Sequence, residues 1–145
     1  DIIELKEMGD DTSGTNGELQ EFANILFDFD KFFLREKSKN VLESVYGFMA
    51  SNPTVTIRLE GHTDWFGSEP YNVGLSRNRS LSAHKYLINK GIAPNRIQNA
   101  WFGETTPTAS NDNPDGSDNP DGRQLNRRVE IKVEIPEMAD LYLSL

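Results

Sequence analysis

Cysteine is absent from the 145 residues of this chain. Its absence excludes disulfides, thiolate metal ligands and cysteine nucleophiles, although it does not identify a cellular compartment. Long hydrophobic runs are also absent, and no apolar stretch approaches the roughly 18 residues that a membrane-spanning helix requires. The chain does not open with the charged and then apolar segment of a secretory signal. Because it starts with Asp1 and runs directly into Ile2-Ile3-Glu4, we expect a domain taken from a longer protein.

Positive charge and histidine are scarce. The chain has 15 Lys and Arg against 23 Asp and Glu, which gives a formal net charge of −8. A chain of this sign repels the phosphate backbone, and its dense basic cluster (Arg123, Arg127 and Arg128) has no interleaved aromatic residues, so no nucleic-acid partner is expected. His62 and His84 are the only histidines, and neither belongs to a metal-binding motif. We therefore expect no metal, no cofactor and no enzymatic activity.

What the sequence contains is an alternation of strand and helix patterns. Val55, Ile57 and Leu59 alternate with polar residues, as in a half-buried strand, and Gly91 follows a long helical pattern as a C′ glycine would. The patterns predict, in order, a strand over 22–29, a helix over 34–49, a strand over 54–59, a helix over 71–90, and strands over 97–102 and 129–135. This order predicts the α/β class, as an α+β two-layer sandwich with a mixed four-stranded sheet and two main helices on one face.

The folded domain is expected to occupy residues 20–135. Residues 1–19 are rich in turn formers and indicate a linker or the remnant of an upstream region. Residues 136–145 form a tail whose apolar residues have helical spacing. A short docked helix and a frayed terminus are both open interpretations of this tail.

One loop contains a repeat. Residues 112–117 and 118–123 are identical except at the last position, and each copy contains Asn-Pro-Asp-Gly. Because Pro-Asp-Gly is typical of turns, the loop is predicted to make two consecutive turns. The clustered Asp and Asn oxygens would also suit calcium, but no glutamate follows at the spacing of an EF-hand. The turn interpretation is favoured, and calcium stays open.

An acid and an arginine are placed at the same end of a predicted strand-loop-helix unit. Asp64 follows the strand in a glycine-bounded turn, and Arg79 lies about two turns into the next helix. A carboxylate can bind an ammonium and a guanidinium can bind a carboxylate bidentately, so the pair could hold a zwitterion. The simpler interpretation is a salt bridge that braces the loop, worth about 0–1 kcal/mol. Spacing alone favours the salt bridge.

Asp64 and Arg79 belong to a longer series of short motifs that covers most of the chain. They are Gly61-His62-Thr63-Asp64, Gly67, Asn72, Leu75-Ser76 and Arg79, then Gly91-Ile92, Gly103-Glu104, Pro107 and Asn126-Arg127-Arg128-Val129-Glu130. In this combination and order, they resemble the peptidoglycan-binding domain of the OmpA-like family (the OmpA, Pal and MotB type). The matches span residues of roughly 25 to 134, and they reverse the preference for a simple salt bridge.

The resemblance implies a function and a set of ligand positions. It implies non-covalent binding of peptidoglycan through the meso-diaminopimelate of the stem peptide, with Asp64 on the ammonium and Arg79 on the carboxylate. The other ligand positions that it implies are Asn72, Arg127, Asp28, Phe29 and Leu75. The domain would then anchor an outer-membrane protein to the Gram-negative cell wall from the periplasm, with membrane contact only through the rest of the parent protein.

Three features differ from the usual family pattern. Ser80 replaces the usual alanine, the loop before Asn126 is longer, and Trp65-Phe66 is more aromatic than the usual polar loop. The aromatic pair could stack on sugar or cover the peptide stem, and packing of Trp65 over the domain edge is an equal alternative. The long loop could narrow the entrance to the pocket.

Two alternative functions are weighed against wall binding. The first is an interaction or assembly domain that keeps the fold without binding the wall, in which the acidic loop and the apolar tail carry a protein contact. Self-association stays open in either case. The second is wall hydrolysis through Asp64 and His62, which ranks lowest because the sequence shows no nucleophile, metal set or paired carboxylates.

Overall fold

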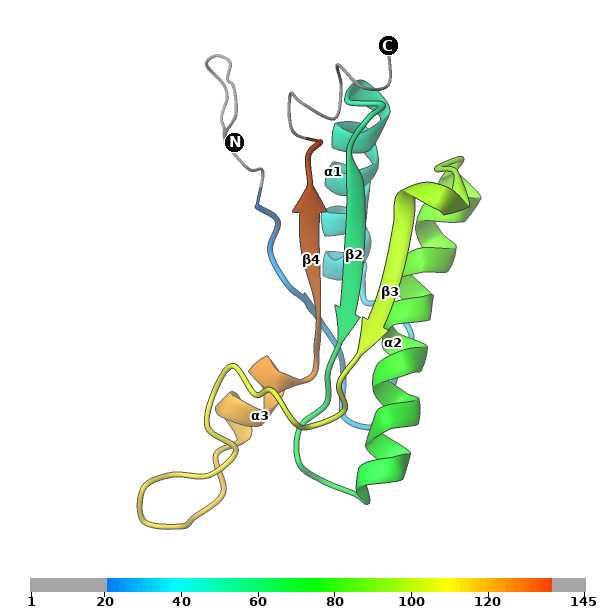
Figure 1. Cartoon of the computed structure of the whole chain (residues 1–145). Helices are drawn as coiled ribbons and strands as arrows, with labels where there is room; N and C mark the ends of the chain where they lie inside the picture. The colour runs from blue at the N-terminus through cyan, green and yellow to red at the C-terminus, as the bar shows by residue number, and fades with distance from the viewer. Residues whose placement is uncertain (1–20, 137–145) are drawn as a thin grey trace.

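The computed structural model describes residues 21–136, which fold into a sheet with two long helices on one face and a short helix beyond the strand ends (Figure 1). The elements are β1 (Ile25–Leu26), α1 (Glu36–Ser51), β2 (Thr56–Gly61), α2 (Glu69–Lys90), β3 (Ile97–Trp101), α3 (Pro120–Asn126) and β4 (Arg128–Glu134), with a 3₁₀ turn at Pro94–Arg96 before β3. The strand order is β1-β4-β2-β3. β2 and β3 are parallel, and β4 runs antiparallel to β1 and to β2. The predicted α+β sandwich with a mixed four-stranded sheet is confirmed.

The predicted linker at 1–19 and all but the first residue of the predicted tail at 136–145 lie outside the described residues. Within residues 21–136, none of the helices combines the length and the apolar character needed to cross a membrane.

A core of aliphatic side chains joins the sheet to the two long helices. Ile57 and Leu59 on β2 are fully buried, because alternate residues of a strand point to the same face. Leu42 of α1 and Leu87 of α2 belong to the same cluster and are also fully buried. Burial of each such side chain contributes roughly 1.5–3 kcal/mol to folding. The core therefore fixes the position of α2 on the sheet, and α2 carries half of the site described below.

α2 begins and ends at recognisable residues. The hydroxyl of Ser68 accepts a hydrogen bond from the N–H of Tyr71 (3.3 Å), and Pro70 occupies the first turn, where proline is tolerated. The helix thus starts two residues earlier than the sequence predicted, because its cap lies before the proline. Gly91 ends it with φ 111, in the left-handed region, and its N–H donates to the carbonyl of Ile88 (2.9 Å). The predicted glycine end is confirmed.

Small residues let α2 lie very close to β2. Gly61 faces the backbone of Ser76, and Ser80 donates a hydrogen bond to the carbonyl of Leu59 (2.7 Å). The same hydroxyl accepts from the side-chain amide of Asn99 on β3 (2.8 Å). Ser80 therefore joins the helix to two strands through one buried oxygen, which is a structural reason for serine at this position.

The predicted first strand is wrong in length. Only Ile25–Leu26 pairs with β4, at Val129 and Arg128, whereas the sequence predicted a strand over 22–29. After Phe27 the chain leaves the sheet, and Asp30 adopts φ 56, which is uncommon for a residue other than glycine. The aromatic residues after Phe27 made the segment resemble a strand, but they lie in a loop.

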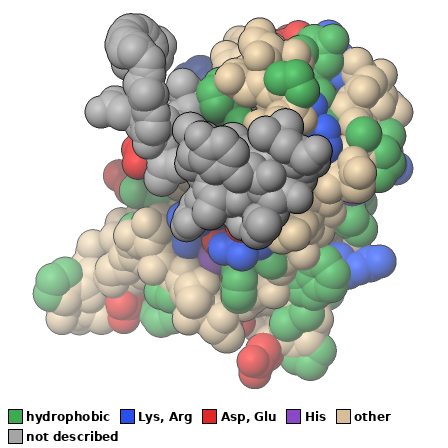
Figure 2. Space-filling model, turned by 45° about the horizontal axis from the view of Figure 1, so that its top comes forward, with side chains coloured by type: hydrophobic (Ala, Val, Ile, Leu, Met, Phe, Trp, Pro, Cys, Tyr) green, Lys and Arg blue, Asp and Glu red, His purple; other side chains and the backbone are tan. Residues whose placement is uncertain are grey.

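The repeated Asn-Pro-Asp-Gly adopts two different structures. In the first copy, the N–H of Gly116 donates to the carbonyl of Asn113 (2.9 Å), which is the predicted turn. In the second copy, Asn119 caps α3 by accepting from the N–H of Gly122 (3.2 Å), so the prediction of a second turn is wrong. The residues that follow decide the outcome, because Arg123-Gln124-Leu125 can continue a helix. Figures 1 and 2 show that the loop ahead of α3 projects from the body of the domain.

The close approach of α2 to β2 can be tested at Gly61. A Cβ atom at this position would lie 2.0 Å from the carbonyl oxygen of Ser76, so the helix would have to move off the strand. We expect Gly61→Ala to lower the free energy of unfolding by about 2–3 kcal/mol or more, in line with overpacked cores. Chemical denaturation followed by circular dichroism would measure this loss.

Gly47 on α1 provides the matched control. It is exposed, and a Cβ atom there would meet nothing within 4 Å. Gly47→Ala should raise the free energy of unfolding by roughly 0.5–1 kcal/mol, because alanine is the better helix former. Similar effects of the two substitutions would contradict the tight contact between helix and strand.

Candidate ligand-binding site

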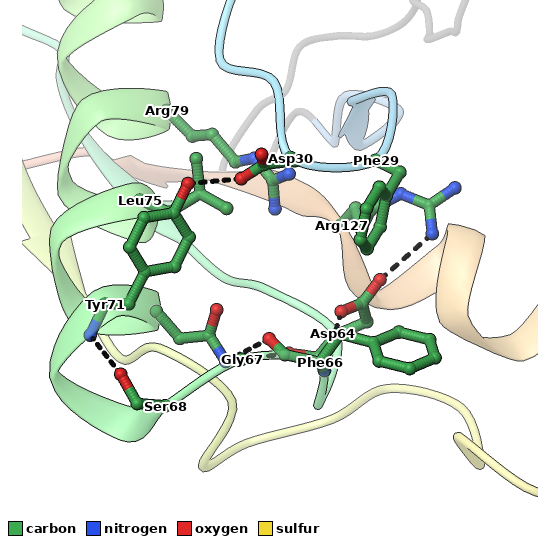
Figure 3. A pocket seen from close by; sticks show the side chains of 11 residues that line it. Phe29, Asp30, Asp64, Phe66, Gly67, Ser68, Tyr71, Leu75, Arg79 and Arg127 are labelled. Carbon is green, nitrogen blue, oxygen red and sulfur yellow. Dashed lines mark hydrogen bonds and ion pairs between the residues drawn. The ribbon is translucent and has the colours of Figure 1, made fainter.

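A cavity of about 370 Å³ opens where β2 ends and α2 begins (Figure 3). Its walls come from the loop after β1, from the loop between β2 and α2 with the first half of α2, and from the residue before β4. The lining residues are Phe29, Asp30, Asp64, Phe66, Gly67, Ser68, Tyr71, Asn72, Leu75, Arg79 and Arg127. Two arginines and two aspartates share this small space, so the cavity presents both signs of charge.

Arg79 is completely buried, which is rare for a charged side chain. Its Nε donates to the carbonyl of Lys31 (2.8 Å), its Nη1 to the carbonyl of His62 (2.9 Å) and its Nη2 to the carbonyl of Asp28 (3.3 Å). The guanidinium carbon also lies 5.3 Å from the ring centroid of Phe27. These contacts hold α2, the end of β2 and the loop after β1 together.

The guanidinium of Arg79 keeps donors for a ligand. An arginine has five N–H groups, and the bonds to the carbonyls use one on Nε, one on Nη1 and one on Nη2. Counting the described residues 21–136, one N–H is left on each terminal nitrogen, and a guanidinium can bind the two oxygens of a carboxylate through a pair of N–H groups. Burial lowers the pKa of Arg79 to about 10, and the carboxylate of Asp64 opposes this shift. The side chain therefore stays charged at neutral pH.

Asp64 is the buried anion of the cavity, with 4% of its surface exposed. Its Oδ2 accepts from Nη1 of Arg127 (3.0 Å), and its Oδ1 accepts from the backbone N–H of Phe66 (3.0 Å). A carboxylate has about four acceptor positions, so room is left for an ammonium. Within residues 21–136, Asp64 pairs with Arg127 and Arg123, and the salt bridge to Arg79 that spacing suggested is not formed.

Asn72 holds the loop that carries Asp64. It is 1% exposed, and its amide nitrogen donates to the carbonyl of Phe66 (2.8 Å) and to the carboxylate of Glu104 (2.9 Å). Both N–H donors are thus used inside the protein, which leaves the amide oxygen as the group that a ligand could meet. Asn72 therefore has two roles, because it lines the cavity and also holds the loop that carries Asp64.

Six of the predicted ligand positions line the cavity. They are Phe29, Asp64, Asn72, Leu75, Arg79 and Arg127. Asp28 does not, because its side chain is 52% exposed and its carboxylate accepts from Nη2 of Arg35 (2.6 Å). Asp30 lines the cavity instead and accepts a hydrogen bond from the hydroxyl of Tyr71. The unusual backbone of Asp30 turns its side chain to the cavity, and sequence pattern does not reveal such a turn.

Arg123 is a neighbour of the cavity that the sequence did not assign to it. Its guanidinium binds both carboxylate oxygens of Asp118 (2.7 and 2.6 Å) and lies 4.6 Å from the ring centroid of Phe66. Its Nη1 is also 4.0 Å from Oδ2 of Asp64. Arg123 therefore links the projecting loop to the cavity. The available signal was its place in the basic cluster, just ahead of the Asn126-Arg127-Arg128 motif.

His62 turns its side chain away from the cavity. The imidazole stacks on Phe102 with centroids 5.2 Å apart, and its Nδ1 lies 3.1 Å from the hydroxyl of Thr106. It is 3% exposed, and Nε2 has no hydrogen-bond partner among the described residues. Burial, and then the charge of Arg128, lower the pKa of His62 to about 4, so the ring is neutral at pH 7.

Two glutamates lie beside His62 on the helix-free face of the sheet. One ring nitrogen and one oxygen each from Glu60 and Glu130 lie within 4.8 Å of one another, which is a spacing that metals can use. Both carboxylates, however, already bind guanidinium groups, at 2.7 Å from Arg58 and 2.6 Å from Arg128. Lys132 also contacts Glu130, at 3.0 Å. Since these cations outnumber the carboxylates, the cluster disfavours a further dication.

The model of the OmpA family matches residues 26–120, more than half of the chain. The chain belongs to the OmpA family. The resemblance inferred from the Asp64 and Arg79 motifs is thereby confirmed, and the cavity can be considered as part of an OmpA-family domain.

Two relatives match this chain over most of its length. The chain is 42% identical over 111 residues to photosystem I P700 chlorophyll a apoprotein A2 of Gloeobacter violaceus, and 40% identical over 111 residues to outer membrane protein A of Bordetella avium. Each match covers 77% of this chain, but 13% of the first relative and 54% of the second. The chain therefore spans only part of the length of the curated relatives that it matches.

Solved structures share the fold. The peptidoglycan-associated lipoprotein from Burkholderia pseudomallei has a TM-score of 0.68 at 22% identity, over 77% of this chain and 89% of that one. The C-terminal domain of Helicobacter pylori MotB has a TM-score of 0.67 at 25% identity, over 83% of this chain and 90% of that one. The overall fold of this chain is therefore one that solved structures share.

The supporting role of Asn72 predicts the effect of a near-isosteric change. Asn72→Asp replaces the amide donors with an acceptor that would face Glu104 and the carbonyl of Phe66. We expect the free energy of unfolding to fall by about 1–3 kcal/mol, the usual cost of an unsatisfied buried polar group. Asn78→Asp on the same helix is the control, because its side chain makes no hydrogen bond within residues 21–136. Comparable losses in denaturant titrations of both variants would contradict the assigned role.

The lowered pKa of His62 predicts a dependence of stability on pH. Between about pH 6.5 and 4 the unfolded chain binds a proton at His62 that the folded protein excludes. The free energy of unfolding should therefore fall as pH decreases through this range, by about 1–3 kcal/mol from this residue. Denaturant titrations at pH 7, 5.5 and 4 would show a shallower decline in His62→Gln. Parallel declines in the two proteins would mean that other groups cause the effect.

Proposed function

We propose that this OmpA-family domain binds peptidoglycan non-covalently through the meso-diaminopimelate of the stem peptide. The observation that carries the proposal is the combination in one cavity of Asp64 and Arg79, which keeps two N–H donors unused among the described residues 21–136. The side-chain end of diaminopimelate bears an ammonium and a carboxylate. Asp64 takes the ammonium and Arg79 takes the carboxylate, both through charge-assisted hydrogen bonds. Figure 3 shows both groups turned toward the same space.

The charge balance of the cavity supports a zwitterionic ligand. Asp30 and Asp64 offset Arg79 and Arg127, so the lining has no formal net charge. A bound group with one charge of each sign keeps this balance, whereas a simple cation or anion would leave an uncompensated charge in a partly buried space, which is costly. Diaminopimelate is therefore a better match than an amine or an acid alone.

The relatives support a location at the outer membrane. Outer membrane protein A is a relative of this chain, and a peptidoglycan-associated lipoprotein shares its fold. We place the domain in the periplasm of a Gram-negative cell, where it anchors an outer-membrane parent to the wall and touches the membrane only through the rest of that parent. One module binds a small ligand moderately, and the many equivalent sites of the wall increase retention of a tethered protein.

Calorimetric titration with meso-diaminopimelate tests the proposal, with lysine as the ligand control because it lacks the distal carboxylate. Saturable binding that strongly prefers diaminopimelate is expected. Asp64→Asn keeps the size of the side chain and an acceptor for the N–H of Phe66, but removes the charge. It should weaken binding by about 2–5 kcal/mol, which is roughly 30-fold or more.

Two further variants complete this test. Asp115→Asn, on the projecting loop, changes a carboxylate that accepts from Ser117 outside the cavity, and it should leave the affinity unchanged. Arg79→Lys should lose binding, but it also removes bonds to backbone carbonyls, so its stability must be compared with Arg77→Lys on the same helix. Absence of binding to diaminopimelate and to a larger muropeptide would reject the proposal and favour an assembly domain.

A further inference from the structure

Three half-exposed aromatic rings line the cavity, and a fourth lies next to one of them in the chain. Phe29, Phe66 and Tyr71 line it and are 54%, 47% and 54% exposed, and Trp65, between Asp64 and Phe66 in the chain, is 43% exposed. In Figure 3 the rings of Tyr71 and Phe66 lie on opposite sides of the cavity. Large apolar side chains that are clustered and solvent-exposed beside a binding cavity indicate a contact surface.

The three rings that line the cavity are held in place before any ligand arrives. The hydroxyl of Tyr71 donates to the carboxylate of Asp30. Phe66 packs edge-on against Phe29, with centroids 5.7 Å apart and an interplanar angle of 88°, and the guanidinium of Arg123 lies over its ring. A rigid aromatic side chain loses little conformational entropy when it contacts a ligand, so the arrangement favours binding.

Trp65 differs from the other rings because it keeps an unused donor. Its indole N–H makes no hydrogen bond within the described residues 21–136. A tryptophan whose only role is packing is normally buried, and its indole N–H is then hydrogen-bonded. An exposed ring with a free N–H combines an apolar face with one polar contact, which suits a ligand that has both.

We propose that this aromatic rim (Phe29, Trp65, Phe66 and Tyr71) is a sugar subsite, which takes the apolar face of a pyranose ring of the glycan strand. The inference rests on the proposed function of the neighbouring cavity. A pyranose ring presents C–H groups on its face, which fit the negative face of an aromatic ring, and hydroxyl or amide groups at its edge. The rim itself contributes no charge, as suits a neutral sugar, whereas the zwitterionic end of the stem peptide enters the charged cavity.

The chemistry of the polymer brings both groups within reach of one domain. The diaminopimelate is joined to its sugar through two residues of the stem peptide, which span roughly 7 Å when extended, and its side chain adds to this length because the distal end is the part held in the cavity. A cavity that holds the diamino acid therefore keeps a sugar close to its mouth. The alternative role of the rim is to cover the peptide stem alone, and a series of ligands can separate the two roles.

The experiment compares a sugar-free stem tripeptide that ends in meso-diaminopimelate with the same tripeptide on its disaccharide. We expect the disaccharide peptide to bind about 10-fold more tightly to the unmodified protein. Trp65→Ala should reduce this ratio of affinities to near 1, and Trp65→Phe, which keeps a ring, should retain most of it. Trp101→Phe changes the other tryptophan of the chain, which is 38% exposed, ends β3 and lies beside Arg77 rather than next to Phe66, and it should keep the full ratio.

Fluorescence gives a second readout that does not depend on affinity. The chain has two tryptophans, so Trp101→Phe leaves Trp65 as the only one. Its emission should change more with the disaccharide peptide than with the sugar-free peptide at saturation. Equal affinities for the two peptides, or a ratio that Trp65→Ala does not change, would overturn the sugar subsite while the charged cavity still binds. Failure of both peptides and of free diaminopimelate to bind would instead reject the proposed function as well.

Discussion

The buried guanidinium of Arg79 is the interaction on which the cavity depends. A charge removed from water must be compensated, and here backbone carbonyls of Lys31, His62 and Asp28 supply much of the compensation. Because these carbonyls come from separate segments, one side chain determines how the loop after β1, the end of β2 and the helix α2 meet. The same bonds orient the remaining N–H groups, so the structural role of the residue prepares its proposed role in binding.

The position of the polar side chains that line the cavity depends on the close packing of α2 against β2. The absence of a side chain at Gly61 and the buried hydroxyl of Ser80 let α2 lie against β2, and this places the start of the helix beside the loop that carries Asp64. Asn72 and Arg127 then fix that loop from opposite sides. Each charged group of the cavity is therefore supported by neighbours that are themselves fixed, so a ligand meets donors and acceptors that need little rearrangement.

Much of the fold could be predicted from the sequence, because alternating strands, helical spacing and the glycine at position 91 are local signals. The motif residues that line the cavity could also be predicted. Two features could not. Asp30, whose backbone angle is left-handed, lines the cavity while Asp28 binds Arg35 outside it, and the same tetrapeptide forms a turn at 113–116 and caps a helix at 119–122. In both cases the structure is decided by neighbouring residues, whose effect no local pattern encodes.

The shortness of β1 has a mechanical consequence. Its pairing with β4 covers only Ile25 and Leu26, and the loop that follows immediately supplies carbonyls to Arg79. Tension applied to the chain ahead of Ile25 therefore reaches the cavity within a few residues, with little sheet in between to bear the load. A pull strong enough to detach this strand would withdraw the buried Ile25 from the core and loosen Arg79 at the same time, so the core and the proposed binding should weaken together under force.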